Sequence, residues 1–225
     1  MLYKETVSKE MWELLQRFMK DEKLKDFILV GGTALSLTIG HRQSIDIDLF
    51  TLKNFKEQDM VAYIKNNYPL RQIREIVEST LLLDIEKVKV DIIAHQYPWQ
   101  EPIQTEEGVR LASLTDIGAM KLHAIFLNGS RIKDFVDMYF LLEHHPLKTY
   151  LEAYKKKYNG NISLAAYGLV HHTNIDMQEK VMLIKGKETS WKKMAERLNK
   201  AVFNPTLKFA ETKNQITPPK RGFRR

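Results

Sequence analysis

The 225-residue chain has no cysteine and no long uncharged apolar run. Without cysteine it can form neither disulfides nor thiolate metal sites. No segment approaches the roughly 18 apolar residues that a transmembrane helix requires. The N-terminal sequence MLYKETVSKEMWELL also lacks the apolar core of a signal peptide. We therefore expect a cytoplasmic protein that has no membrane partner.

Acidic residues are fewer than basic ones: 28 Asp and Glu stand against 35 Lys and Arg, for a formal net charge of +7. Much of the surplus lies late in the chain, in the lysines at 155–157 and 192–193 and in the stretch from Lys220 onward. Positive charge raises the affinity for polyanions without reading their sequence. Each run alone is typical of a solvated helix face or a frayed terminus, but together they favour an RNA partner.

The hydrophobic periodicity changes along the chain. The first part alternates helix-like and strand-like patterns, and it predicts helices after Ser8 and at 33–39 and 55–67 and strands at 27–30, 45–50 and 109–111. Residues 70–94 predict two or three further strands with a turn near 86–87. From residue 113 the pattern is helical, at 115–127, 132–143, 147–158, 162–170 and 191–203.

Strands first and helices afterwards predict an α+β fold, in which an α/β core with a mixed sheet precedes a helical C-terminal half. We expect the core at 1–110, a helical domain that completes the site at 111–212, and a mobile basic tail at 213–225.

The most informative stretch is FILVGGTALSLTIGHRQSIDIDLF, residues 27–50. Asp46 and Asp48 alternate with Ile45, Ile47 and Leu49, so a strand would place both carboxylates on one face and the three aliphatic side chains in the core. Adjacent carboxylates repel each other unless a cation neutralises them, and a hard divalent cation prefers oxygen ligands. The alternative is a solvated edge strand.

Gly31 and Gly32 end the apolar run before these acids. Glycines allow backbone N–H groups to approach a phosphate closely, and the helix that begins at Thr33 would favour an anion at its N-terminus. A metal ion beside a phosphate indicates nucleotide chemistry. Two metal ions would need a third carboxylate from a neighbouring strand. We expect Asp91, in KVDII, with Asp84 as its rival and the solvent side of a hairpin as the alternative.

Gly31-Gly32 followed by Asp46-Ile47-Asp48 resembles the core motif of the nucleotidyltransferase superfamily related to DNA polymerase beta. The longer segment from GGTAL to HRQSIDIDLF resembles the AbiEii/AbiGii abortive-infection toxin family. The resemblance implies transfer of a nucleoside monophosphate from a nucleoside triphosphate (NTP) to an acceptor hydroxyl, with release of pyrophosphate. It also implies Mg²⁺ or Mn²⁺ at Asp46, Asp48 and Asp91, and a toxin that acts on tRNA or another RNA beside an antitoxin partner.

A second block, KLHAIFLNGSRIKDFVDMYFLL, resembles the downstream motif of that toxin family. The resemblance implies that Lys121 contacts the triphosphate and that Asp134 is either a base for the acceptor hydroxyl or the group that orients Lys121. Asp137 would make a structural ion pair. The family often has arginine near Asn128, and Arg131 could replace it. Taken alone, the block is equally consistent with two amphipathic helices that carry surface salt bridges.

Other residues near the motif leave alternatives open. Thr33 and Ser36 would either offer hydroxyls to the phosphates or cap and pack the helix. Arg42 is a candidate triphosphate contact, and His41 is interpreted as an ordinary loop histidine. The histidine pairs at 144–145 and 171–172 lack carboxylates at zinc-ligand spacing. At the level of function, the alternatives are a catalytically silent relative that binds nucleotide or RNA and a transferase that modifies a small molecule.

Overall fold

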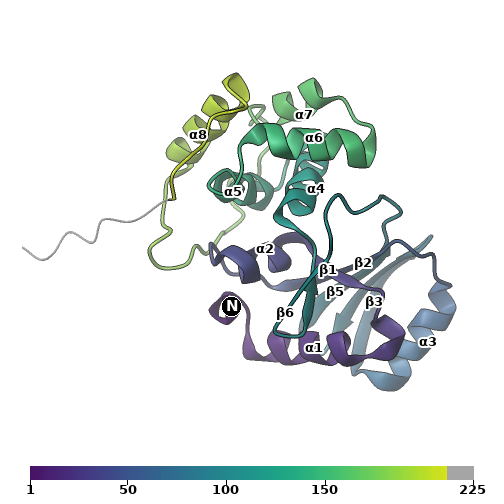
Figure 1. Ribbon diagram of the computed structural model, residues 1–225. Coiled ribbons are helices and arrows are strands. Elements are labelled where there is room, and N and C mark those ends of the chain that lie inside the picture. Colours follow the sequence, from purple (N-terminus) through teal and green to yellow (C-terminus); the bar gives the residue numbers. More distant parts are fainter. Residues whose placement is uncertain (212–225) are drawn as a thin grey trace, which may run out of the picture.

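A computed structural model describes residues 1–211, so the predicted tail at 213–225 lies outside the described part (Figure 1). The strands of the described part are β1 (Ile28–Val30), β2 (Asp46–Thr51), β3 (Leu70–Val77), β4 (Thr80–Ile85), β5 (Val88–Ala94), β6 (Gln104–Glu106) and β7 (Val109–Leu111). Its α-helices are α1 (Lys9–Lys20), α2 (Gly31–Ile39), α3 (Glu57–Asn67), α4 (Leu114–Leu127), α5 (Ile132–Leu141), α6 (Leu147–Tyr158), α7 (Ile162–Gly168) and α8 (Trp191–Phe203). Short 3-10 turns cover Lys4–Thr6 and Glu22–Leu24.

The strands form one mixed sheet in the order β3-β4-β5-β2-β1-β7-β6. The central strand β2 pairs antiparallel with β1 and parallel with β5, while β1 runs parallel to β7. In Figure 1, α1 and α3 lie along one side of the sheet, and the helices from α4 onward gather at the opposite side. The α+β class and the order of a sheet-bearing part before a helical part are confirmed.

Alternation along β2 places Ile47 and Leu49 in the core with no exposed surface, while Asp46 and Asp48 are partly exposed on the other face. Ile45 differs from the expectation: it precedes the strand and its exposed fraction is 60%. Because Ile45 lies outside the hydrogen-bonded strand, the alternation of side chains between the two faces of the sheet does not apply to it. Only two of the three expected aliphatic side chains therefore enter the core.

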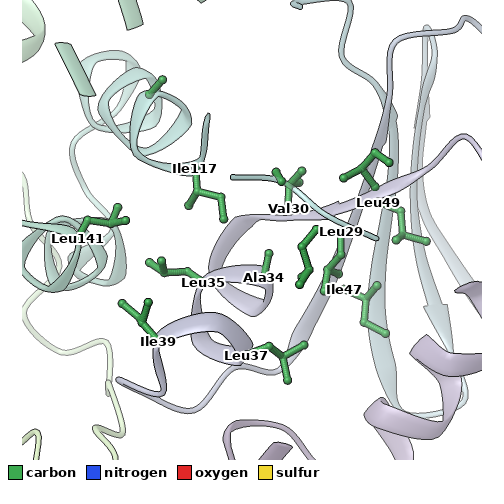
Figure 2. Packing of buried hydrophobic residues seen from close by; sticks show 14 of the residues in the cluster. Leu29, Val30, Ala34, Leu35, Leu37, Ile39, Ile47, Leu49, Ile117 and Leu141 are labelled. Carbon is green, nitrogen blue, oxygen red and sulfur yellow. The ribbon is translucent and has the colours of Figure 1, made fainter. Parts of the chain in front are cut away.

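Helix α2 is apolar on nearly all sides because it is packed between the sheet and the helical half. Figure 2 shows Leu35 and Ile39 on the side of α2 toward Leu141, and Ala34 on the side toward Leu29. This central helix joins the two parts through one continuous hydrophobic core. It also fixes the position of its own N-terminus against β2.

Most predicted elements are present, but several have different ends: α3 begins at Glu57 rather than at residue 55, and α7 ends at Gly168 rather than at residue 170. Helix α2 begins at Gly31 rather than Thr33, and α5 ends at Leu141 rather than at residue 143. Strand β6 was not expected, because Gln104–Glu106 is a short polar edge strand without an alternating apolar pattern. The predicted turn at residues 86–87 does join β4 to β5.

The chain returns from the helical half to the core. Leu183 forms an antiparallel bridge with Arg42, and the Gln43 N–H donates to the Met182 carbonyl oxygen at 2.8 Å. The Ile184 N–H donates to the His41 carbonyl oxygen at 3.0 Å. Residues 181–184 are thus a strap across the loop before β2. The division at residues 110–111 remains a prediction. Within residues 1–211, no helix has both the length and the apolar character needed to cross a bilayer.

Candidate active site

A cavity of about 400 Å³ lies between the sheet and the helical half, within the size range of small-molecule sites. Its walls come from both parts of the molecule. The sheet supplies the carboxylates of Asp46, Asp48 and Asp91, and α4 and α5 supply Lys121 and Asp134. Residues that are distant in the sequence therefore share one site.

The three carboxylates occupy one face of the sheet. Asp48 is directly opposite Asp91 in the parallel pair β2–β5, and Asp46 lies two residues away on the same strand. Burial raises the pKa of Asp48 to about 7, and the nearby charges of Asp91 and Asp46 act in the same direction. One oxygen of Asp46 is buried without a hydrogen-bond partner in the described part. Lys121 and Arg131 oppose the rise in the pKa of Asp48, but within residues 1–211 neither Asp46 nor Asp48 forms a salt bridge.

Asp91 and Asp84, the two candidates for the third carboxylate, both lie close to Arg74 on β3. Its Nη2 donates to Asp91 Oδ1 at 2.6 Å, and its Nε lies 2.9 Å from Asp84 Oδ1 without hydrogen-bond alignment. Asp91 lines the cavity, whereas Asp84 is not among its lining residues. Burial raises the pKa of Asp91, although the bond from Arg74 opposes that shift. The placement supports Asp91 over its rival.

The carboxylates fit a divalent cation in their chemistry. They supply only oxygen donors, one of those oxygens is buried and unpartnered, and the like charges repel. Among residues 1–211, no three His, Asp or Glu side chains already stand at metal-binding spacing. Asp46 and Asp48 would therefore be the first ligands, and Asp91 would have to exchange Arg74 for the metal ion.

The two glycines lie in the first turn of α2, not in a loop before it. Gly31 has a φ of +68°, and a Cβ there would collide with the Asp48 carboxylate. A Cβ on Gly32 would collide with the Arg42 guanidinium. The N-cap residue Val30 supplies no side-chain bond, so the first N–H groups of the helix remain available at the cavity wall. The absence of side chains here brings Asp48 and the helix N-terminus together.

Thr33 and Ser36 are fully buried, and neither lines the cavity. The Thr33 hydroxyl donates to the main-chain oxygen of Asp46 and lies 2.8 Å from Ser44 Oγ. The Ser36 hydroxyl has no hydrogen-bond partner in the described part. These placements agree with the alternative that both residues pack the helix, and neither residue lines the cavity in which the phosphates were expected.

Lys121 lies in a buried charge network between α4 and α5. Its Nζ is 2.7 Å from Asp134 Oδ1 and 2.7 Å from Asp137 Oδ2. Arg42 Nε donates to Asp137 Oδ1 at 2.6 Å. Burial disfavours the charged form of Asp137, but Arg42 and Lys121 outweigh it and hold its pKa well below the usual range. Two cations therefore balance two carboxylates.

Several residues that were predicted to belong to the site lie in this charge network. Asp137 makes the structural ion pair that was expected of it. Asp134 contacts Lys121, which is the arrangement expected of an orienting group. Arg42 and Lys121 line the cavity, but both are already paired with carboxylates. His41 is not an ordinary loop residue, because it is fully buried and its Nε2 lies 2.8 Å from Asp137.

The cavity rim carries the expected Arg131 and two lysines that were not expected, Lys133 and Lys180. Arg131 is the exposed residue that precedes α5, lines the cavity and has no ion-pair partner within residues 1–211. Lys180 is exposed on the same rim, and Lys133 pairs with Glu179 at 2.8 Å. Asn128, where the family often has arginine, does not line this cavity.

The predicted basic run at 155–157 is not one solvated face. Lys155 and Lys156 are exposed, but Lys157 is buried and its Nζ lies 3.0 Å from Asp116 Oδ1. None of the three lines the cavity, and the residues from Lys220 onward lie outside the described part. Sequence reasoning also missed Phe50, His95 and Tyr158 as cavity residues, because no local pattern connects these scattered rings.

The sequence is similar to a known protein family and to one further protein. The family model described as "Nucleotidyl transferase AbiEii toxin, Type IV TA system" matches residues 13–81 and 67–212. An uncharacterised protein from Aquifex aeolicus is 32% identical over 203 residues, which cover 87% of this chain and 96% of that protein.

Two solved structures from Helicobacter pylori share the fold. One, a proposed nucleotidyltransferase, has a TM-score of 0.57 and 21% identity, with 87% of this chain and 91% of the other covered. The second, JHP933, has a TM-score of 0.55 and 19% identity, with 88% and 92% covered. Because the glycine turn, the paired acids and the helical lysine block all lie within the matched residues, the chain belongs to the AbiEii nucleotidyltransferase toxin family.

Proposed function

We propose that this protein transfers a nucleoside monophosphate from an NTP to an acceptor hydroxyl and releases pyrophosphate. The main support is the pairing of Asp48 with Asp91 across β2–β5, beside an unpartnered oxygen of Asp46 and the open N-terminus of α2. Carboxylates and helix N–H groups that face the same cavity suit a metal-bound polyphosphate.

The residues of this chain would mainly position the reactants. Asp46, Asp48 and Asp91 would hold Mg²⁺ or Mn²⁺, which would neutralise charge on the reacting phosphate and on the departing pyrophosphate. The N–H groups of the first turn of α2 would hold phosphate oxygens, with Arg131 at the rim. Lys121 would direct its ammonium group into the cavity while Asp134 fixes its orientation.

Membership in a toxin family supports a toxin that is paired with an antitoxin protein. The formal charge of +7 and the exposed Arg131 and Lys180 at the rim favour tRNA or another RNA as the acceptor. A small cationic molecule, as in antibiotic modification, would gain less from such a rim.

The test is to incubate the purified protein with Mg²⁺, total cellular RNA and each labelled NTP in turn. We expect label from one or more NTPs to enter RNA of defined size, and Asp48→Asn to abolish incorporation without unfolding the protein. If every NTP binds but none is transferred, the protein is a silent relative. If label enters small molecules only, the RNA acceptor is wrong while the transferase assignment stands.

A further inference from the structure

The end of the cavity away from the carboxylates is walled by uncharged rings. Phe50, His95, His123 and Tyr158 come from β2, the residue after β5, α4 and the end of α6. The His123 and Tyr158 rings are stacked, with centroids 4.0 Å apart and planes 8° apart. His95 Nε2 lies 3.0 Å from the Tyr158 hydroxyl, and the His95 ring is 5.1 Å from that of Phe50. We call these four residues the ring wall.

The ring wall carries no charge at neutral pH. Burial lowers the pKa of His95 to about 4, and burial also lowers the pKa of His123. Ile93, Met120 and Leu127 continue the apolar lining. The two ends of the cavity therefore differ in chemistry: carboxylates, cations and helix N–H groups at one end suit a metal-bound polyphosphate, while neutral rings at the other suit a planar uncharged group.

The separation of the two ends follows from strand geometry. In the β2–β5 pair, Asp48 is opposite Asp91, and two residues further along each strand Phe50 is opposite Ile93. Side chains two residues apart on a strand lie on the same face, so Phe50 and Ile93 follow the acids along that face. The His95 N–H donates to the Thr51 carbonyl oxygen at 2.7 Å, which extends that ladder. At about 3.3 Å per residue, the ring wall begins about 7 Å from the acids and reaches His95 at about 13 Å. A base that is joined to a phosphate through a sugar would fall within this span.

A buried ion pair holds the ring wall in place. Lys157, the neighbour of Tyr158, lies 3.0 Å from Asp116 on α4, and both side chains are fully buried. Asp116 also accepts a bond from the Gln100 N–H at 3.0 Å, and the Lys157 ammonium lies 4.5 Å from the centre of the Trp99 ring. These contacts fasten the loop after His95 to α4 and α6. Because Lys157 precedes Tyr158, the ion pair also limits the movement of the Tyr158 ring before any ligand binds.

We propose that the ring wall is a nucleobase-binding subsite in which the base packs against the stacked His123–Tyr158 pair and contacts Phe50. The proposal rests on the proposed function, because the phosphates of the same nucleotide would occupy the acidic end. The base would come either from the NTP or from the end of the acceptor RNA. The chemistry of the wall is the same for both, so the experiment must separate them.

The first test compares ligands on the wild-type protein by calorimetry with Mg²⁺ present. Stacking of one base on aromatic groups is expected to make an NTP bind about 5–150-fold more tightly than inorganic tripolyphosphate. A short single-stranded oligonucleotide tests the acceptor source. If tripolyphosphate binds as tightly as every NTP and the oligonucleotide does not bind, the subsite is wrong while the phosphate site stands. If neither NTP nor tripolyphosphate binds, the proposed function fails as well.

Variants then assign the source. Tyr158→Leu should weaken the NTP if the base belongs to the donor, or the oligonucleotide alone if it belongs to the acceptor, and should leave tripolyphosphate unchanged. Tyr158→Phe keeps the ring and should stay within about threefold of wild type. Tyr167→Leu is the matched control, since Tyr167 is 59% exposed on α7. Equal affinities of Tyr158→Leu and wild type for both base-bearing ligands would overturn the proposal.

If Tyr158→Leu does not fold, NMR of the wild-type imidazole signals replaces it. Binding of an NTP or the oligonucleotide should shift the ring signals of His95 and His123 through the ring current of the base. The signals of His144 and His145 should not move, because neither residue lines the cavity. Tripolyphosphate should leave all four unchanged. Equal shifts with tripolyphosphate would contradict a base at the wall.

Discussion

Asp48 lies among like charges, so the stability of the metal-free protein should depend on whether this carboxyl is ionised. The folded state raises its pKa from 3.8 to about 7, which means that the folded protein holds the proton more tightly than the unfolded chain. Raising the pH from about 4 to about 7 therefore removes stability, and the loss is complete above pH 7.

The substitution Asp48→Asn removes this titration. We expect the variant to melt above wild type at pH 8 and close to wild type at pH 4. A pKa raised from 3.8 to about 7 sets an upper limit of about 4 kcal/mol on the difference at pH 8, and each kcal/mol corresponds to about 2–4 °C in a chain of this size. Saturating Mg²⁺ should raise the wild-type melting temperature and leave the variant unchanged. Thermal melts from pH 4 to 8, with and without Mg²⁺, measure this. A wild-type curve that is flat with pH would contradict the assignment.

Gly31 combines a positive φ with the close approach of Asp48. Gly31→Ala should therefore destabilise the fold and displace the Asp48 carboxylate, weakening Mg²⁺ binding at least tenfold. Gly108→Ala is the matched control: φ there is +78°, but the nearest atom to an added Cβ is Gln16 Oε1 at 3.9 Å. Backbone strain alone should cost the control about 1 kcal/mol with no change in metal affinity. Equal metal affinities in both variants would leave Gly31 with a conformational role only.

At the scale of elements, the network across α4 and α5 makes Lys121 both a structural and a functional candidate. Lys121→Ala leaves Asp134 and Asp137 with one fewer cation, and breaking a buried pair costs about 3–5 kcal/mol. Lys121→Arg keeps the charge, so we expect most of the stability to return. Its KM for the NTP should stay several-fold above wild type, because a planar guanidinium does not replace a compact ammonium group.

Urea unfolding and steady-state kinetics on both variants separate these two roles. If Lys121 contacts a phosphate, Lys121→Arg should restore most of the stability but not the wild-type KM for the NTP. Should Lys121→Arg restore both to wild-type values, Lys121 would have only the structural role. Lys192→Ala, in an exposed position on α8, controls for the loss of any positive charge.

At the scale of the whole molecule, the positions of the cations locate the expected RNA contact. Arg131 and Lys180 stand at the cavity rim, whereas Lys155 and Lys156 are exposed elsewhere on α6. If RNA binds across the rim, Arg131→Ala with Lys180→Ala should flatten the dependence of log K on log salt. The slope should fall by about 0.7–0.9 for each phosphate that the variant no longer binds.

Filter binding at several salt concentrations measures the slope. The double variant Lys155→Ala with Lys156→Ala removes the same charge and should keep the wild-type slope. The affinity for the NTP should fall in the rim variant, because Arg131 is expected to contact the phosphates, and should stay at the wild-type value in the α6 variant. A larger effect of the α6 variant than of the rim variant would move the RNA path to α6, and undetectable binding at low salt would exclude an RNA acceptor.

The local features of this protein were determined by the sequence itself. Alternation around Asp46 and Asp48 indicated a strand with both acids on one face, and the 3–4 spacing after Ser8 indicated α1. Such patterns depend on neighbours in the chain, so they can be read without a fold. Ile45 continues the alternation in the sequence, but it lies before the first residue of β2, so its predicted burial was wrong, and β6 was not predicted because its short polar sequence has no alternating apolar pattern.

Which distant residues meet was decided only by the tertiary structure. It paired Asp48 with Asp91, left Asp84 outside the cavity, and buried Lys157 against Asp116 although the sequence offered it as one of three similar lysines. It also gathered His95, His123 and Tyr158 into one wall. The physical reason is that strand register and helix packing are set by burial across the whole core, and a local pattern does not specify the partner that each side chain finds there.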